Sequence, residues 1–127
     1  MLEQGIKGEQ LARELLKKRG YTIFEIDWIA EKNDNYLQVE VKHKEGFKPP
    51  PFYGHGMEVW KVKKRLDFEA RFGIRAYFLI FDTDSSIYGQ FLNKLNKTKY
   101  FDTKNGIRIY NIIEFEKLGA TQCPANV

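Results

Sequence analysis

The sequence predicts an α/β protein with a mixed central sheet flanked by helices. Two amphipathic segments, 8–20 and 58–72, have the hydrophobic spacing of helices, and residues 21–43 between them have the pattern of a strand meander. A nearly continuous apolar run, "RAYFLIFDT" (75–83), follows the second helix and is typical of a central strand buried on both faces. A sheet with one helix on each face is the simplest packing of elements in this order.

The N-terminal elements follow from local patterns. Leu11, Ala12, Leu15 and Leu16 form the apolar stripe of the first helix, and Gly20 is placed to end it. "NDN" (33–35) predicts a turn, after which residues 36–43 alternate as a strand. Two faces result from this alternation. The buried face has Leu37, Val39 and Val41, and the polar face has Gln38, Glu40, Lys42 and Lys44.

The middle of the chain is predicted to be a loop followed by a helix. Residues 45–56 contain three consecutive prolines and read as an extended loop. The helix runs from Glu58 to Phe72 and ends at Gly73. Val59, Val62, Leu66 and Ala70 face the core, and Lys61, Lys64 and Arg65 face away from it.

The C-terminal part is predicted to be mainly β-structure. "SSIYGQFLNKL" (85–95) reads as a strand with a helical end, and Asn105-Gly106 predicts a hairpin turn. "EFEKLG" (114–119) is interpreted as a last helical turn. We expect one domain over residues 1–127, with a core of about 5–93 and a C-terminal hairpin and tail over 94–127.

Composition narrows the class of protein. The net charge is +4 with a pI of about 9.1, and lysines crowd the middle third of the chain, which favours a polyanionic partner. The single cysteine, Cys123, excludes an internal disulfide. The sequence contains no apolar run long enough to span a membrane and no signal-peptide pattern, so we expect a soluble cytoplasmic protein without a membrane partner.

Two carboxylates and a lysine are predicted to converge on one patch of the sheet. Asp27 precedes Glu40 by 13 residues across the 33–35 turn, so strand pairing brings it close to register with Glu40 and Lys42. Two carboxylates that close repel each other unless one is protonated or a cation lies between them. Oxygen ligands in small number suit Mg²⁺ or Mn²⁺. Lys42 could then hold a water or neutralise developing charge.

These residues resemble the signature of the PD-(D/E)xK nuclease superfamily, which consists of an aspartate followed by the pattern of Glu40-Val41-Lys42. "GEQLARELLKKRGY" (8–21) is similar to the leading helix of the archaeal Holliday junction resolvases, and Glu9 matches their glutamate near the helix start. Lys61 matches the polar residue of the helix after the third strand. The resemblance covers residues 5–82. Ile26 stands where the family has proline, and the segment before Asp27 is short.

The resemblance implies a restriction-endonuclease-like αβββαβ core with a C-terminal β-hairpin extension. It also implies a Mg²⁺- or Mn²⁺-dependent endonuclease that hydrolyses phosphodiester bonds in DNA, with branched structures among the substrates to be expected. Asp27, Glu40 and the carbonyl of Val41 would bind the metal, Lys42 would orient the attacking water, and Glu9 would support the metal. Six residues are expected to grip nucleic acid: Lys44, Lys48, His55, Lys61, Lys64 and Arg65.

The same sequence features fit several other functions. The chain could be a catalytically inactive nucleic-acid-binding module on the same fold, an RNA nuclease, or an unrelated α/β protein in which Glu40 and Lys42 form a surface pair. His55 could bind metal, contact phosphate or hold its loop. Trp60, Phe52 and Tyr53 could stack on unpaired bases or pack locally. A homodimer is plausible, since a small single-site enzyme must pair to cut both strands symmetrically.

Overall fold

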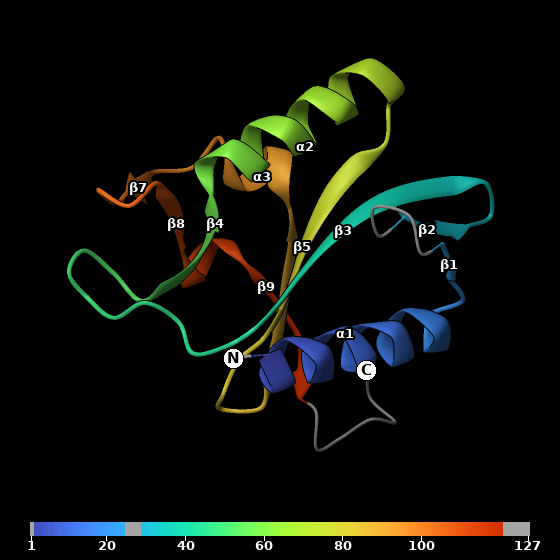
Figure 1. Ribbon diagram of the computed structural model, residues 1–127, viewed down its shortest axis with the longest axis horizontal. Helices are drawn as coiled ribbons and strands as arrows, with labels where there is room; N and C mark the ends of the chain where they lie inside the picture. Colours follow the sequence, from blue (N-terminus) through green and yellow to red (C-terminus); the bar gives the residue numbers. More distant parts are fainter. Residues whose placement is uncertain (1, 25–28, 121–127) are drawn as a thin grey trace.

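The structure is a computed structural model that describes residues 2–24 and 29–120 (Figure 1). Its helices are α1 (Leu2–Lys18), α2 (Val59–Phe72), α3 (Leu92–Leu95) and the short 3₁₀ helix η2 (Ile112–Glu114). Its strands are β1 (Thr22–Phe24), β2 (Ile29–Lys32), β3 (Asn35–His43), β4 (Gly54–Glu58), β5 (Arg75–Phe81), β6 (Ser86–Phe91), β7 (Tyr100–Asp102), β8 (Ile107–Asn111) and β9 (Glu116–Ala120).

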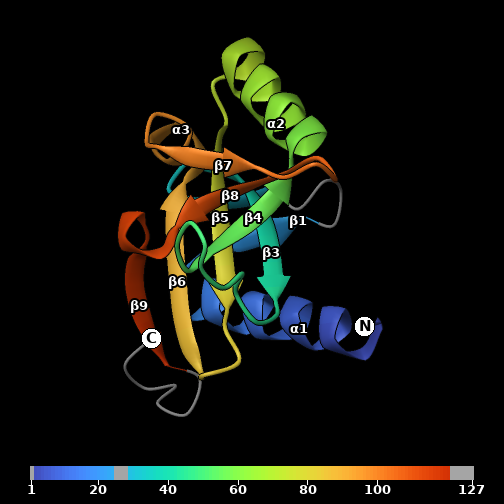
Figure 2. The ribbon, with the colours of Figure 1, turned by 90° about the vertical axis from the view of Figure 1, so that its left-hand side faces the viewer.

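The central sheet is mixed, as predicted. Its strand order is β1-β2-β3-β5-β6-β9, in which β3 and β5 pair in parallel and the other neighbours are antiparallel. Helix α1 lies on one side of this sheet, and α2 lies on the other side with a second sheet of order β4-β8-β7 (Figures 1 and 2). The chain therefore forms the predicted layers, with a helix on each face of the sheet.

Two hydrophobic clusters hold the layers together. Under α1, Ala12, Leu15 and Leu16 pack against Val39 of β3 and Leu79 of β5. On the opposite face, a second cluster joins α2, α3 and β4 to the sheet. Its buried members are Met57, Val62, Ala76, Phe78, Ile80, Leu92, Leu95, Tyr110 and Phe115. Burial of side chains from both faces of β5 explains its almost uninterrupted apolar sequence.

The β2–β3 turn has the geometry of a tight hairpin. Lys32 pairs with Asn35, so Asn33 and Asp34 form a two-residue connection, and both have a positive φ, of 52° and 65°. Asparagine and aspartate tolerate this conformation better than most residues. The turn predicted from "NDN" is therefore confirmed for a local physical reason. Ile29 pairs with Gln38 at the other end of the described ladder.

Of two predictions for the C-terminal part, one is confirmed and the other is wrong. The Asn105-Gly106 hairpin between β7 and β8 is confirmed, with Gly106 at a φ of 81°. The predicted helical turn at 114–119 is wrong, because Glu116–Ala120 form β9, which pairs with β6 at the edge of the central sheet. Residues beyond 93, where the core was expected to end, thus contribute to the main sheet.

The predicted loop at 45–56 is shorter than expected because its end forms β4. Gly54 pairs with Asn111 and Gly56 with Ile109 in the second sheet. A Cβ at Gly54 would lie 2.1 Å from the carbonyl oxygen of Tyr110, so only glycine permits this approach of the strands. The glycines on either side of His55 therefore serve the close pairing of β4 with β8.

Helix α2 has the predicted ends. Glu58 is the residue before the helix, and Gly73 ends it in the left-handed conformation with its N–H donating to the carbonyl of Glu69. Val62 and Leu66 face the core as predicted, but the prediction is wrong for three other residues of the helix. Ala70 is exposed, whereas Lys61 and Arg65 face β3. Lys61 and Arg65 lie toward the strand because they form ion pairs with Glu40, which hydrophobic periodicity does not predict.

Among the described residues, no helix is both long enough and apolar enough to cross a lipid bilayer.

Candidate active site

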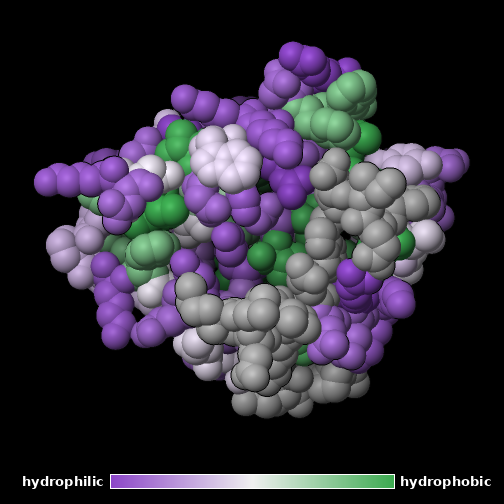
Figure 3. Space-filling model, viewed as in Figure 1, coloured by the Kyte–Doolittle hydropathy of each residue, from purple (hydrophilic) through white to green (hydrophobic). Residues whose placement is uncertain are grey.

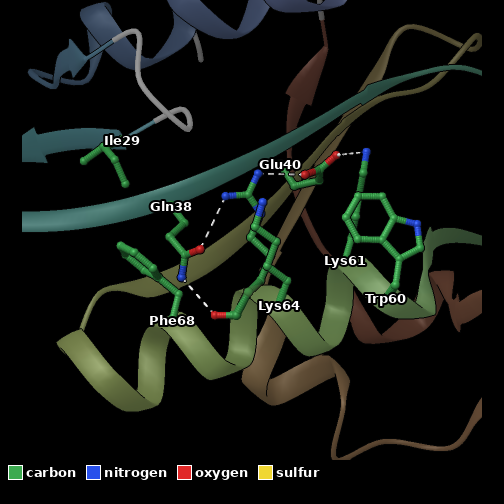
Figure 4. Close-up of a pocket in the computed structure, with 8 residues that line it drawn as sticks. Ile29, Gln38, Glu40, Trp60, Lys61, Lys64 and Phe68 are labelled. Carbon is green, nitrogen blue, oxygen red and sulfur yellow. Dashed lines mark hydrogen bonds and ion pairs between the residues drawn. The ribbon is translucent and has the colours of Figure 1, made fainter.

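A pocket lies between the polar face of β3 and helix α2 (Figure 4). Strand β3 contributes Gln38 and Glu40 to its lining, and Ile29 of β2 adds an apolar edge. The helix contributes the remaining lining residues, three basic side chains between two aromatic ones: Trp60, Lys61, Lys64, Arg65 and Phe68. The pocket thus brings Glu40 together with three of the predicted nucleic-acid-binding residues.

Both carboxylate oxygens of Glu40 bind cations from α2. Oε1 accepts a hydrogen bond from Nη2 of Arg65 at 2.9 Å, and Oε2 lies 3.5 Å from Nζ of Lys61. The Glu40 side chain is only 11% exposed. Lys61 and Arg65 are one helical turn apart, so they reach the strand from the same side of α2. The helix therefore holds Glu40 in a fixed orientation.

Gln38 fixes the position of Arg65. Its Nε2 donates to the backbone carbonyls of Arg65 at 3.0 Å and Ile74 at 2.9 Å. Its Oε1 accepts from Nη1 of Arg65 at 3.3 Å. The side chain is 3% exposed, which differs from the prediction of a solvent-facing strand face. An amide can be buried here because its donor and acceptor atoms are both satisfied.

Glu58 connects Lys42 to the same cluster. Its Oε1 lies 3.3 Å from Nζ of Lys42, and its Oε2 lies 3.3 Å from Nζ of Lys61. Burial acts to raise the pKa of the Glu58 carboxyl, but its backbone hydrogen bond and the two lysines outweigh burial and leave the pKa below its ordinary value. Glu58 is therefore ionised and holds Lys42 beside Glu40.

The ionic cluster carries an excess of positive charge. Two carboxylates, Glu40 and Glu58, face the three cations of Lys42, Lys61 and Arg65, which gives a net charge of +1. Lys64, whose side chain is exposed, adds a further charge at the pocket. This balance suits an anionic ligand such as a phosphate group.

The described residues do not by themselves fit a divalent metal site. Among them, no group of three or more His, Cys, Asp or Glu side chains could hold a metal ion. Glu40 has both oxygens engaged by cations, and Val41, whose carbonyl was the other predicted ligand, lies in the middle of the β3–β5 ladder. A second converging carboxylate is needed before a divalent cation is favoured here over Lys61 and Arg65.

Two predicted catalytic carboxylates are not placed by the structure. Asp27 lies outside the described residues. Glu9 lies within α1, but its side chain is also outside the described part of the structure. Its neighbour Gly8 is informative, because a Cβ there would lie 2.5 Å from the Cβ of His43. The first part of α1 therefore packs closely against the end of β3, the strand that carries Glu40 and Lys42.

The lysines of the 44–53 segment are not gathered at the pocket. Lys48 is exposed and pairs with Glu45 at 3.4 Å, and Lys44 lies 5.0 Å from the ring centre of Phe47. Strand β4, which is about 16 Å long, separates this segment from α2, and the segment extends away from the helix in Figure 1. Lys44 and Lys48, two of the predicted nucleic-acid-binding residues, are therefore not brought together with those of α2.

His55 is a buried residue and not a phosphate contact. Only 1% of its side chain is exposed, and its Nε2 lies 2.8 Å from Oδ2 of Asp82. Burial lowers the pKa of His55, although Asp82 acts to raise it. Tyr53 donates to the same oxygen of Asp82 at 2.6 Å. Through its contact with Asp82, His55 holds β4 to the end of β5. Of the three alternatives for His55, its role is therefore the structural one.

Sequence reasoning missed three residues of the pocket region. Glu58, at the helix boundary, is spaced three residues from Lys61, the distance typical of helical ion pairs, and could have been noted on that ground. Phe68 is spaced eight residues from Trp60 and so lies on the same helix face. Gln38 offered no signal, since its burial depends on the carbonyl of Ile74, which is 36 residues away.

Comparison with known proteins supports the fold. No family model matches the sequence. No curated protein matches it either. The structure is similar to that of Hjc, a Holliday junction resolvase from the archaeal hyperthermophile Archaeoglobus fulgidus, with a TM-score of 0.59 and 17% sequence identity over 94% of this chain and 96% of that chain. The chain thus has the restriction-endonuclease-like fold, over nearly its whole length.

Proposed function

We propose that this protein is an endonuclease that hydrolyses phosphodiester bonds in DNA. The observation that carries the proposal is the position of Glu40 and Lys42 on one face of β3, beside a pocket lined by the cations of α2. The likeness to a Holliday junction resolvase over 94% of the chain supports the same class of activity. Branched DNA is accordingly the first substrate to examine.

The residues of the pocket have distinct proposed roles. Lys61, Lys64 and Arg65 bind backbone phosphates, which replace the carboxylate partners that Lys61 and Arg65 have in the free protein. Lys42, which is 21% exposed, orients the attacking water or neutralises charge that develops on the phosphoryl oxygens. Glu58 holds the Lys42 ammonium in place. Glu40 becomes available as a carboxylate once phosphate has drawn its cations away.

Metal dependence is part of the proposal through the sequence resemblance. That resemblance assigns Asp27, Glu40 and the carbonyl of Val41 as ligands of Mg²⁺ or Mn²⁺, with Glu9 in support. A divalent cation at such a site supplies electrostatic stabilisation and lowers the pKa of a bound water. We also propose that the protein acts in the cytoplasm and that a homodimer is the form that cuts both strands.

The alternatives differ in the presence of cleavage and in the substrate. An inactive binding module would retain the basic pocket and bind nucleic acid without cutting it, whereas an RNA nuclease would cut RNA in preference to DNA. The test is incubation of the purified protein with branched, duplex and single-stranded DNA and with RNA, each with and without Mg²⁺ or Mn²⁺. The proposal requires metal-dependent cleavage of at least one DNA substrate. Cleavage of RNA alone, or of nothing, would contradict it.

A further inference from the structure

Two aromatic side chains flank the cations of the pocket. Trp60 and Phe68 both lie on α2 and line the pocket, with Lys64 midway between them in sequence (Figure 4). Spacings of four residues place all three on one side of a helix. Trp60 is 61% exposed, which is unusual for so large an apolar side chain. Its exposure requires an explanation that core packing does not provide.

Charge surrounds Trp60 on its own helix. Nζ of Lys61 lies 5.6 Å from the centre of the Trp60 ring, and the same ammonium is shared with Glu40 and Glu58. In Figure 3, hydrophilic side chains cover the first part of α2, and a hydrophobic patch lies over its last part. An exposed indole among lysines is poorly suited to an apolar protein partner but well suited to a ligand with both flat rings and negative charge.

We infer that the α2 pocket binds an unpaired segment of DNA, with Trp60 and Phe68 stacking on bases and Lys61, Lys64 and Arg65 binding the backbone. This inference rests on the proposed function and deepens it by naming the substrate class. Aromatic platforms combined with a basic groove are the usual means of binding single strands, because every base presents a flat face. Bases in an intact duplex are already stacked and cannot reach these rings.

The spacing of the two rings fits more than one nucleotide. Eight residues of helix span about 12 Å, whereas neighbouring stacked bases in one strand are about 3.4 Å apart. Trp60 and Phe68 therefore meet different bases of one strand, and Lys64 lies between them where a connecting phosphate would pass. Glu40 lies in the wall of the same pocket, so an unpaired segment held here is next to the proposed site of cleavage.

The test compares two oligonucleotides and several variants. Binding of a labelled single-stranded oligodeoxynucleotide and of a blunt duplex of equal length is measured by fluorescence anisotropy in EDTA, so that no cleavage occurs. Trp60→Ala is expected to weaken single-strand binding by about fivefold or more and duplex binding by less than about twofold. Trp60→Phe keeps an aromatic ring and should retain most of the single-strand affinity.

Two controls separate stacking from other effects. Ile113→Ala removes an apolar side chain that is 77% exposed in η2 and is not among those lining the pocket, so it should change neither affinity. Lys64→Ala should weaken binding of both oligonucleotides. Equal losses for both in Trp60→Ala, or no loss in either, would overturn this inference and leave the proposed nuclease intact. Failure of the unaltered protein to bind any DNA would overturn both.

Discussion

Two networks of ionisable side chains lie on the same side of the central sheet, and they differ in exposure and in charge. In the Glu40 cluster, consisting of Lys42, Glu40, Glu58, Lys61 and Arg65, side chains are 11% to 30% exposed and cations outnumber carboxylates. In the Asp82 network, formed with Tyr53 and His55, the Asp82 carboxylate is 2% exposed and its partners are a phenol and an imidazole. Only the first network can exchange its partners for a ligand.

The difference shows what makes a polar cluster functional. Asp82 accepts hydrogen bonds on both oxygens, from Tyr53 and His55 on one and from the backbone of Thr83 on the other, so nothing is left to bind a substrate. The cations around Glu40 outnumber the carboxylates of their cluster, and they border a pocket. Ionisable residues in a sequence indicate a site only where the fold leaves them accessible and unbalanced in charge.

The largest expected effect is the loss of stability on removing Asp82. In Asp82→Ala, the Tyr53 hydroxyl, the His55 ring and the Thr83 N–H lose their acceptor inside the protein. We expect a loss of about 3 kcal/mol or more in the free energy of unfolding, measured by urea denaturation. Asp67→Ala is the matched control, since it breaks an exposed ion pair with Arg71 and should cost less than about 1 kcal/mol. A similar loss of unfolding free energy in Asp82→Ala and Asp67→Ala would contradict the difference drawn here between a buried network and exposed ion pairs.

The second prediction is that the protein loses stability as the pH is lowered. His55 has a lowered pKa because burial outweighs the opposing effect of Asp82, with Lys44 and Asp84 making smaller contributions of opposite sign. The unfolded chain, with a histidine pKa of about 6.5, therefore takes up the proton first. Stability is full above about pH 6.5 and falls as the pH is lowered, by at most about 1.4 kcal/mol per pH unit for this group.

Asp82 acts in the same direction at lower pH. Burial raises its pKa, but hydrogen bonds from Tyr53 and His55 outweigh burial and lower it, so its contribution to stability is lost as the pH falls through the folded-state pKa. The check is urea denaturation between pH 7 and pH 5 of the unaltered protein and of His55→Gln. In the variant, the free energy of unfolding should fall less steeply as the pH is lowered, because the contribution of His55 is missing. The same pH dependence of the free energy of unfolding in both proteins would contradict the contribution assigned to His55.

Glu40→Gln should have a moderate effect on stability. The predicted convergence of Asp27 and Glu40 implies that removing one of the two charges would maintain or raise stability without metal, because the carboxylates repel each other. The structure instead shows Glu40 between Lys61 and Arg65, so neutralising it removes one attractive partner from each of these cations and leaves Lys61 paired with Glu58 alone. We now expect a loss of about 1 kcal/mol, measured by thermal unfolding in EDTA. A gain in stability would mean that these ion pairs do not stabilise the protein.

The smallest expected effects separate the two lysines of the pocket. Lys64→Ala should weaken DNA binding for all sequences and flatten the dependence of log affinity on log salt by about one unit. Lys61→Ala should have a smaller effect, because its ammonium must first leave Glu40 and Glu58. Equal effects, measured by anisotropy over a range of salt concentrations, would mean that those ion pairs do not compete with phosphate.

Elements with local signals could be predicted from the sequence. The first helix, the meander up to β3, the second helix with its terminal Gly73, the apolar β5 and the Asn105-Gly106 hairpin are all confirmed, although the first helix begins at Leu2 and not at residue 8. Each has a turn residue, a cap or a hydrophobic period within a few positions. The mixed sheet followed from their order.

Features that depend on distant partners could not be predicted in this way. Strand β4 consists largely of glycine and polar residues and is defined by pairing with β8, more than fifty residues later. Strand β9 was mistaken for a helical turn because its partner β6 lies far away in the sequence. The burial of His55 and Gln38 likewise depends on Asp82 and Ile74. The pattern of Glu40 and Lys42 was visible, but the cations that hold Glu40 were placed on the wrong helix face.

The most direct test of the central claim, that the Glu40 cluster is a site of phosphodiester cleavage, measures cleavage and binding of one DNA substrate in parallel for the unaltered protein and Glu40→Gln. The variant should lose metal-dependent cleavage. It should bind DNA as tightly as the unaltered protein or more tightly, because Glu40 no longer competes with phosphate for Lys61 and Arg65. Full cleavage by Glu40→Gln, on a substrate that the unaltered protein cuts, would contradict the account.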